Sequence, residues 1–288
     1  MRIDELYKQK RAERDYVMSL EIFPPKKDGD DETLIEMVKG LKGHKPDFIS
    51  VTYGAGASGS RNKTLDVATQ IKKEIALPVL HHLTCAANTR DEIEGILSDI
   101  GSAGIENILA LRGDLQPGQI LEYNLASDLI EEIKSKNKFS IGAACYPEGH
   151  LTQPGGHENI EHMLKKEIAG ADYFISQLFF DNRFFYDMLE RAHKERITVP
   201  ISAGIMPMMS KAQVERMIFM CGASLPSDLI KIISKYENDL VDLRKASLEY
   251  AIHQMEDLVA NGVDGIHLYA MNHADIANTV FRHFKGGK

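Results

Sequence analysis

One glutamate, Glu21, stands in an apolar stretch near the start of the chain, which reads S-L-E-I-F-P-P. A carboxyl group in apolar surroundings is suited to donate a proton near neutral pH, as general acids do. Pairing with a Lys or Arg on a neighbouring strand is the alternative that the position leaves open. We therefore take Glu21 as a candidate proton donor.

Other polar residues come at the ends of apolar runs further along the chain. Arg112 and Asp114 end the run N-I-L-A-L-R-G-D. They are two positions apart and so share one strand face, while Gly113 between them allows a ligand to approach the backbone. A structural Arg–Asp ion pair is the alternative. The other polar residues at run ends are Thr52, Tyr53, His82, Thr84, Tyr146, Glu148, His150, Gln177, His267 and Tyr269.

A basic cluster lies on a predicted helix from about Asn159 to Gly170. His162, Lys165 and Lys166 are three and four positions apart and form one basic face. Such a face is usually only solvated; in this acidic chain a phosphate-binding face is the alternative. The nearby H-E-N-I-E-H is one residue longer than the zinc motif H-E-x-x-H, and residues five apart point about 140° away from each other on a helix. We therefore predict no metal site.

Residues 51–60, V-T-Y-G-A-G-A-S-G-S, contain the spelling G-x-G-x-x-G of dinucleotide-binding turns. Such a turn follows the first strand of its unit, and an acidic residue ends the next strand. Here the glycines follow the second predicted strand, and Glu74 comes before the third begins. We interpret the stretch as a loop at the mouth of a barrel.

Eight continuous apolar runs predict strands that are buried on both faces. The first seven start 27 to 33 residues apart, as βα units do, and the longer gap before the eighth holds an extra helical pair over 226–238 and 239–262. Glycines 104, 170, 222 and 262 stand where helices should end. The runs begin near Met18, Phe48, Val79, Asn107, Ser140, Tyr173, Pro200 and Gly265.

This pattern predicts an α/β fold, a single (β/α)₈ TIM barrel over residues 1–288 with an extra helical insertion between strands seven and eight. Residues 1–17 would form an N-terminal helical extension and residues 285–288 a tail. A doubly wound sheet is the alternative. Because the chemistry of such barrels occurs at the C-terminal ends of the strands, the polar run ends would meet at one mouth.

Composition excludes several classes of function. The net charge of −8, from 34 Lys and Arg against 42 Asp and Glu, argues against nucleic-acid binding. No apolar run is long enough to span a membrane, and the charged N-terminus is unlike a secretory signal. The three cysteines, Cys85, Cys145 and Cys221, form no C-x-x-C pair, so we expect a reducing cytoplasmic location with neither disulfide nor metal.

Between about Met18 and Phe284 the chain resembles the methylenetetrahydrofolate reductase family in its short bacterial form. The resemblance is carried, in order, by SLEIFPPK, FISVTYGAG, HLTC, NILALRGD, ASDL, AACYPEGH, GADYFISQLFFD, GIMP and GIHLYAMN. It implies a barrel that binds FAD without a covalent bond and a ping-pong reaction. In that reaction NAD(P)H reduces FAD, and 5,10-methylenetetrahydrofolate then takes the hydride to become 5-methyltetrahydrofolate.

The resemblance also implies roles for single residues. Glu21 matches the general acid, Asp114 the carboxylate between flavin and pterin, and Gln177 an amide that binds folate and nicotinamide in turn. Gln213 and His273 match further substrate-binding positions. The cofactor-binding positions are matched by Thr52, Tyr53, Ala55, His82, Arg112, Gly113, Asp114, Ala126, Ala144, Tyr146 and His150, with Asn159, His162, Lys165 and Lys166 for the ADP portion.

The chain departs from the family pattern at several positions. Asn159, His162 and Lys165 replace a common Asp, Asn and Arg, Leu125 replaces a Tyr, and His273 replaces an Arg that contributes to substrate binding. Two alternatives therefore stay open: a barrel flavoprotein with another substrate, and an electron-relay subunit of a larger folate-reducing complex. The resemblance is compatible with a homo-oligomer or with a partner subunit.

Overall fold

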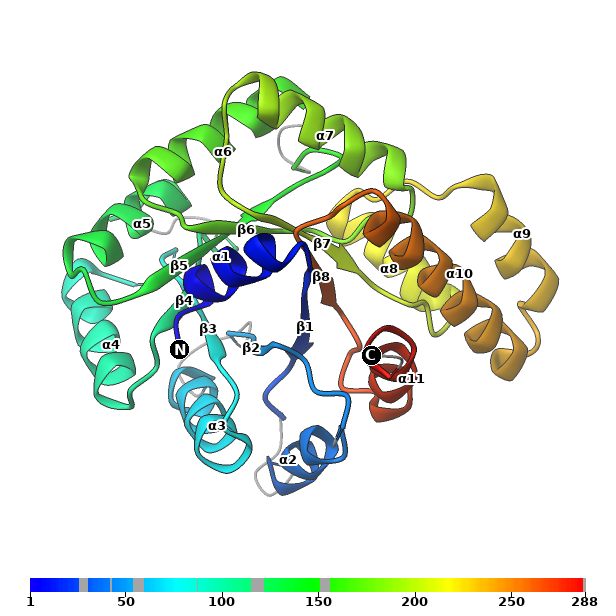
Figure 1. Cartoon of the computed structure of the whole chain (residues 1–288), viewed down its shortest axis with the longest axis horizontal. Helices are drawn as coiled ribbons and strands as arrows, with labels where there is room; N and C mark the ends of the chain where they lie inside the picture. Colours follow the sequence, from blue (N-terminus) through cyan, green and yellow to red (C-terminus); the bar gives the residue numbers. More distant parts are fainter. Residues whose placement is uncertain are drawn as a thin grey trace.

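The computed structural model describes residues 1–25, 31–41, 43–53, 60–86, 88–114, 122–150 and 156–286. Ala55 and the glycines of the 51–60 stretch lie outside these residues. In the described part, eight parallel strands pair in chain order and β8 pairs with β1, which closes the barrel (Figure 1). The predicted TIM barrel is confirmed. Its strands are β1 (Val17–Ile22), β2 (Phe48–Val51), β3 (Val79–Thr84), β4 (Asn107–Leu111), β5 (Ser140–Cys145), β6 (Tyr173–Ser176), β7 (Ile201–Ile205) and β8 (Gly265–Leu268).

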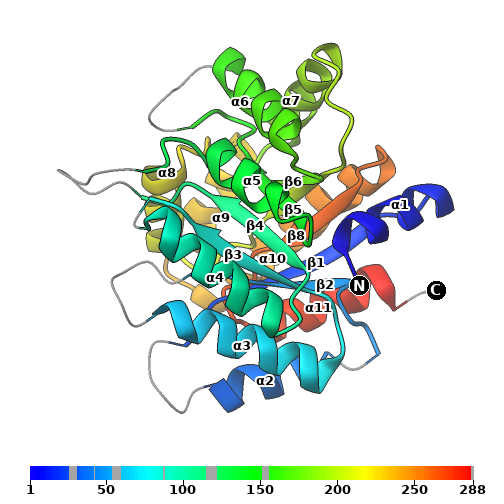
Figure 2. The same ribbon diagram turned by 90° about the vertical axis from the view of Figure 1, so that its left-hand side faces the viewer.

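Helices alternate with the strands and surround the barrel (Figures 1 and 2). The helical pair expected before the last strand is present as α9 and α10, after α8. The helices are α1 (Ile3–Glu13), α2 (Asp31–Lys39), α3 (Ser60–Ile75), α4 (Arg90–Ser102), α5 (Ala126–Ser135), α6 (Gly156–Ala169), α7 (Asn182–Lys194), α8 (Lys211–Cys221), α9 (Ser227–Tyr236), α10 (Leu240–Ala260) and α11 (Ala274–Lys285).

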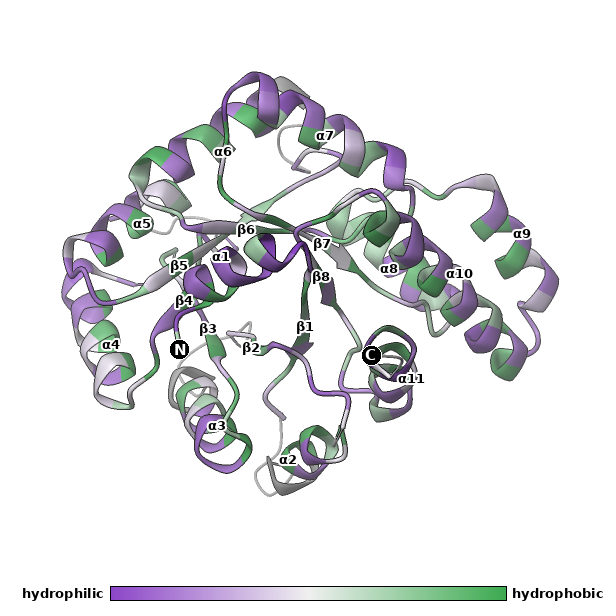
Figure 3. Ribbon diagram, viewed as in Figure 1, coloured by the Kyte–Doolittle hydropathy of each residue, from purple (hydrophilic) through white to green (hydrophobic). Residues whose placement is uncertain are grey.

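The outer helices carry both hydrophilic and hydrophobic residues (Figure 3). In α7, for example, Phe185, Met188 and Ala192 are buried, at the spacing of one helix face. The glycines predicted to end helices adopt left-handed φ angles, such as +69° at Gly222, the C-cap of α8. The described helices include none that is both long and apolar enough to cross a membrane.

Helix α1 covers the N-terminal end of the barrel (Figures 1 and 2). Its residues Ile3, Leu6 and Tyr7 are buried in one apolar cluster with interior residues from the start of the strands. Tyr7 Oη also lies 2.6 Å from Ser202 Oγ of β7. This end is therefore closed by α1. The interior residues of the cluster are Val17, Phe48, Leu80, Leu109, Tyr173 and Ile175.

Candidate active site

Glu21 lies between two buried histidines near the C-terminal end of β1. Its Oε2 atom is 3.5 Å from His267 Nε2 of β8 and 3.7 Å from His82 Nε2 of β3. Each histidine is bonded to a serine on the neighbouring strand: His267 Nδ1 lies 2.7 Å from Ser19 Oγ, and His82 Nε2 lies 2.5 Å from Ser50 Oγ. Five polar side chains from four adjacent strands, β8, β1, β2 and β3, thus form one buried network.

The surroundings of Glu21 differ from those expected from the sequence. The flanking Leu20 and Ile22 belong to the large core cluster between the strands and the helices, because neighbours on a strand point to opposite faces. The carboxyl group itself faces imidazoles, and its partners in the described structure are neither Lys nor Arg. Glu21 is buried as expected, with 8% of its surface exposed. However, the residues that surround its carboxyl group are histidines and not the apolar neighbours in sequence.

His267 can face Glu21 either as a hydrogen-bond donor or as an acceptor. Ser19 Oγ is close both to His267 Nδ1 and, at 3.3 Å, to the Ile266 carbonyl oxygen, but a hydroxyl group has one proton to donate. When Ser19 donates to His267, Nε2–H faces an ionised Glu21. When Ser19 donates to Ile266, the lone pair of Nε2 faces a protonated Glu21. The hydrogen bonds of Ser19 and His267 are therefore compatible with either form of the Glu21 carboxyl group.

His82 is neutral near neutral pH. Burial lowers its pKa to about 4, against the opposing attraction of the Glu21 carboxylate. The resemblance places His82 among the cofactor-binding residues. In the structure its Nε2 atom contacts Ser50 and Glu21, so it also belongs to the network around Glu21.

The end of β4 holds the next group of predicted residues. Gly113 has a φ of +84°, and a Cβ atom there would come within 3.0 Å of Thr84 Cβ, so only glycine fits without strain. Asp114 is exposed to solvent at the mouth. Among the described residues no ion pair joins Arg112 to Asp114, so the simple structural pair is not formed. Arg112 is half-buried.

Helix α6 brings basic residues to the end of β5. Lys166 points inward, with Nζ 2.7 Å from the Ala144 carbonyl oxygen and 5.7 Å from the centre of the Tyr146 ring. Asn159 donates to the Tyr146 carbonyl oxygen at 2.5 Å. Lys165 is exposed instead. The predicted basic face is therefore divided, with Asn159 and Lys166 against the barrel mouth and Lys165 toward solvent.

Positive charge is concentrated at this point. Burial lowers the pKa of Lys166 to about 8. Burial also lowers the pKa of His150 and that of His162, and nearby cations, Arg112 and Lys166 among them, lower these values further. In a chain of net charge −8, a group of mutually repelling cations at the barrel mouth fits an anionic ligand such as a diphosphate.

The predicted substrate residues lie around the other side of the mouth. Gln177, just after β6, accepts a hydrogen bond from Leu178 N at its own Oε1 atom, so its N–H₂ group is what it offers to a ligand. Gln213 is buried on α8 and accepts from Met209 N at 2.7 Å. It therefore holds the Met206–Met209 loop, a role that the sequence did not indicate.

His273, which precedes α11, has a cationic neighbour. The Nη2 atom of Arg244, on α10, lies 3.4 Å from His273 Nδ1. The family resemblance implied only that His273 stands where relatives carry an arginine. The structure brings a guanidinium from the inserted helix to the same point, which no local motif could have indicated.

The remaining predicted cofactor residues also occur at strand ends. Thr52 is buried and donates its N–H to the Ile22 carbonyl oxygen, and Tyr53 follows it. Ala126 begins α5. Ser19, Ser50 and Arg244 are the contributors that the sequence missed. Among the described residues, no group of three or more His, Cys, Asp or Glu side chains is arranged to hold a metal ion.

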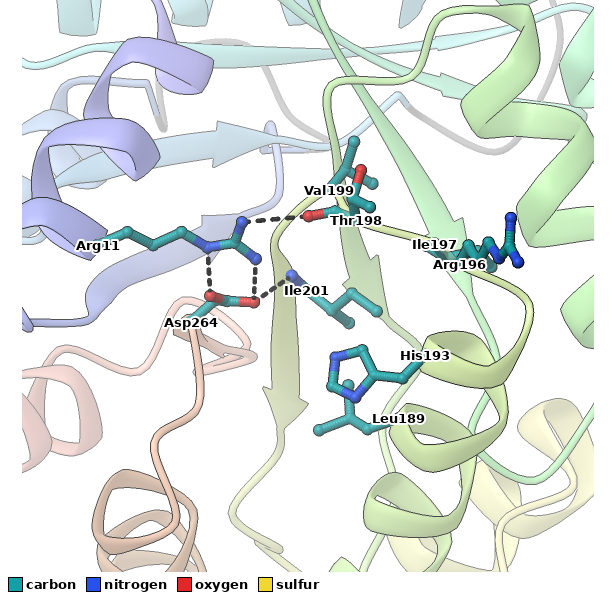
Figure 4. Close-up of a pocket in the computed structure, with 9 residues that line it drawn as sticks. All are labelled: Arg11, Leu189, His193, Arg196, Ile197, Thr198, Val199, Ile201 and Asp264. Carbon is teal, nitrogen blue, oxygen red and sulfur yellow. Dashed lines mark hydrogen bonds and ion pairs between the residues drawn. The ribbon is translucent and has the colours of Figure 1, made fainter.

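A pocket of about 490 Å³ lies at the opposite, closed end (Figure 4). Its wall includes Arg11 of α1, which forms a two-point ion pair with Asp264 at 2.7 and 3.0 Å and donates to the Thr198 carbonyl oxygen at 3.1 Å. No predicted site residue lines it. Because Asp264 neutralises Arg11, we assign this pocket a structural role in fastening α1 to the barrel.

Comparison with known proteins places nearly the whole chain in one family. The profile of the family described as methylenetetrahydrofolate reductase matches residues 6–285. The 5,10-methylenetetrahydrofolate reductases of Salmonella typhimurium and Escherichia coli are 33% and 32% identical to the chain over 263 residues, covering 91% of the chain and 88% of each relative.

Among solved structures, a similar fold is found in an "uncharacterized protein from Clostridium thermocellum" that "binds two copies of 5-methyl-5,6,7,8-tetrahydrofolic acid". The TM-score is 0.64 at 17% identity, and the match covers 97% of this chain and 99% of that one. At this identity the likeness supports the fold alone.

Proposed function

The chain belongs to the methylenetetrahydrofolate reductase family, and on this premise we propose that it reduces 5,10-methylenetetrahydrofolate to 5-methyltetrahydrofolate by a flavin-dependent route from NAD(P)H. The family membership confirms the resemblance and the enzyme class expected from the sequence. The observation that carries the proposal is a buried carboxyl group between two imidazoles at the open end of the barrel.

The residues around β4, β5 and α6 fit FAD. Arg112 and Lys166, with His162 and Lys165 nearby, would hold its diphosphate by charge-assisted hydrogen bonds. The left-handed Gly113 leaves room beside the backbone for a flat ring. When bound, FAD would supply hydride chemistry, accepting hydride from NAD(P)H and giving it to the methylene carbon of the folate. Thr52, Tyr53, Ala55, His82, Ala126, Ala144, Tyr146, His150 and Asn159 complete the proposed set.

Glu21 would supply the proton that opens the imidazolidine ring of the folate. Protonation of a ring nitrogen makes the methylene carbon electrophilic, and the carboxyl group must then recover a proton. His267 Nε2, 3.5 Å from Glu21, and Ser19 behind it give Glu21 a hydrogen-bonded path for that recovery. Neutral His82 stays on the other side and adds no competing charge.

Gln177 and Asp114 would orient the two substrates in turn. The free N–H₂ group of Gln177 suits the carbonyl oxygens that nicotinamide and pterin both carry. The carboxylate of Asp114, exposed and unpaired with Arg112, suits the N–H groups of the pterin ring. Gln213 and His273 would contribute to folate binding, His273 together with Arg244.

The experiment follows flavin absorbance in the FAD-reconstituted protein without oxygen, first with NADH or NADPH and then with methylenetetrahydrofolate. We expect the band to bleach and then to return. Glu21→Gln should bleach as the wild type does but regain its band at least about 100-fold more slowly, because an amide has no acidic proton to give. Glu5→Gln, on the exposed side of α1, is the matched control.

Each other outcome has a definite meaning. If Glu21→Gln slows both half-reactions equally, the general-acid role is refuted. If the wild type bleaches but does not recover with folate, the flavoprotein has another oxidant, and the substitution at His273 is the first place to look. If no flavin binds, the proposed reaction is refuted, whereas the assignment of the TIM-barrel fold is unaffected.

A further inference from the structure

We propose that Asn272 is a positioning residue for Glu21, because its side chain fastens the end of β1 to the turn that follows β8. The inference rests on the proposed function, since it concerns the proton donor of that reaction. Strands β1 and β8 are neighbours in the barrel (Figure 1). Glu21 therefore lies on the strand that Asn272 holds, two residues from the point of contact.

The contact is a two-point hydrogen bond to one residue. Phe23 N donates to Asn272 Oδ1 at 2.9 Å, and Asn272 Nδ2 donates to the Phe23 carbonyl oxygen at 2.8 Å. Both bonds are partly buried. The side-chain amide thus satisfies both backbone polar groups of Phe23, as a neighbouring strand would.

The amide takes over where the backbone pairing of β1 with β8 ends, at Leu20 opposite Leu268. One residue further along, Tyr269 N donates to the Ile205 carbonyl oxygen of β7 and so is not offered to β1. On its other side, β1 remains bonded to β2 through Thr52 N and the Ile22 carbonyl oxygen. Without Asn272, the segment that follows Glu21 in β1 would be hydrogen-bonded only to the β2 side.

The turn after β8 aims Asn272 back at β1. His273 N donates to the Ala270 carbonyl oxygen at 2.9 Å, and the two central residues have left-handed φ angles, +53° at Met271 and +60° at Asn272. This is the pattern of a type I′ turn, in which asparagine is readily accommodated and methionine is not. A strained Met271 in a packed cluster indicates that the surroundings impose this turn.

Only asparagine provides what the position requires. Aspartate would accept from Phe23 N but set an oxygen against the Phe23 carbonyl group. Alanine would lose both bonds and strain the left-handed backbone. Glycine would lose both bonds while keeping the turn, because it is favoured at this position of a type I′ turn. Asn272→Gly therefore removes the contact and leaves the fold.

The test compares Asn272→Gly with a matched control, Asn137→Gly. Asn137 is also a left-handed asparagine, at φ +52°, but it is exposed in the turn before β5 at the closed end. Hydrogen exchange of the segment 18–25 reports the contact without any ligand. We expect the Phe23 amide to exchange at least about tenfold faster in Asn272→Gly and at the wild-type rate in Asn137→Gly.

The second readout is kinetic. Asn272→Gly should keep its melting temperature, its FAD and its bleaching by NAD(P)H, while reoxidation by methylenetetrahydrofolate slows about 10- to 100-fold at saturating folate, as expected when a catalytic group is displaced by about 1 Å. Asn272→Asp should show the same separation of the two half-reactions. A role in folding alone would slow both half-reactions or lower the melting temperature.

Three results would overturn the inference. A protected Phe23 amide in Asn272→Gly would show that the contact does not hold β1. Faster exchange with normal reoxidation would show that the contact does not position Glu21. If the wild type itself is not reoxidised by folate, the proposed function and the positioning role fail together, and the exchange result alone then decides whether the contact exists.

Discussion

Replacing Lys166 by methionine should make the flavin-free protein more stable and its FAD binding weaker. Methionine keeps the length of the side chain and removes the charge. The ammonium group is held at the Ala144 carbonyl oxygen under the Tyr146 ring, where burial lowers its pKa from 10.5 to about 8. A charge that is costly without a ligand becomes useful when an anion binds beside it.

The magnitude follows from the pKa. The pKa of Lys166 is about 2.5 units lower in the folded chain than in the unfolded chain. At pH 7, where the lysine is charged in both states, this difference corresponds to a destabilisation of the folded state by about 3 kcal/mol. The side chain keeps some contact with solvent, and methionine leaves the Ala144 carbonyl oxygen without its donor, which costs about 1 kcal/mol. We therefore expect Lys166→Met to raise the free energy of unfolding by about 1–2 kcal/mol.

The expected effect on FAD has the opposite sign. Loss of one charge-assisted contact of about 1.5–3 kcal/mol should weaken FAD binding about 10- to 100-fold. Urea unfolding of the flavin-free protein and FAD titration followed by fluorescence measure the two effects. Lys165→Met, at the exposed neighbour, is the matched control and should leave the free energy of unfolding unchanged within about 0.5 kcal/mol.

The pH dependence provides the refuting result. Between pH 8 and 10.5 the unfolded chain binds the Lys166 proton more tightly than the folded chain does. The amount by which Lys166 lowers the free energy of unfolding therefore decreases as the pH rises. Burial raises the pKa values of tyrosines and cysteines such as Tyr7 and Cys145 in the folded chain, so unfolding changes their ionisation in this range as well. Subtracting the variant from the wild type removes that contribution. If the stability difference between the two proteins is absent at pH 7, or does not narrow toward pH 10.5, the argument fails.

Two further predictions concern other sites. Asp114→Asn should raise the midpoint potential of bound flavin, because a carboxylate nearby disfavours the anionic reduced form; a redox titration measures it, and an unchanged potential would remove that role. His81 is buried, neither ring nitrogen has a hydrogen-bond partner within the described residues, and burial lowers its pKa to about 3. Because the unfolded chain takes up a proton that the folded chain does not, stability should fall as the pH drops below 6.5, and His81→Leu should abolish about 2 kcal/mol of the loss between pH 7 and 5 in urea unfolding. Equal losses in variant and wild type would contradict this.

The barrel could be predicted from the sequence because its strands are buried on both faces. Such strands appear as continuous apolar runs, and the predicted starts agree with the observed ones to within one residue, Pro200 against Ile201 for β7 being an example. Left-handed glycines such as Gly222 marked the helix ends for a local reason, since other residues avoid that conformation. Both signals depend only on near neighbours in the chain.

The network around Glu21 could not be predicted in the same way. Its members come from β1, β2, β3 and β8, and the distance between Glu21 and His267 is 246 positions in the sequence. The sequence placed both residues at strand ends but could not show that they face each other, since strand order and register decide that. Likewise the inward direction of Lys166 and the outward direction of Lys165 depend on how α6 is rotated against β5.

The position of Arg244 alters how the departures from the family pattern should be interpreted. Judged from the sequence, His273 removes a positive charge from the substrate side of the mouth. In the structure, Arg244 lies 3.4 Å from His273 Nδ1, so a permanent charge is present there, supplied by α10. Its approach is possible because the insertion between β7 and β8 packs beside the turn that also carries Asn272. The same turn therefore contacts β1 through Asn272 and the cation of α10 through His273.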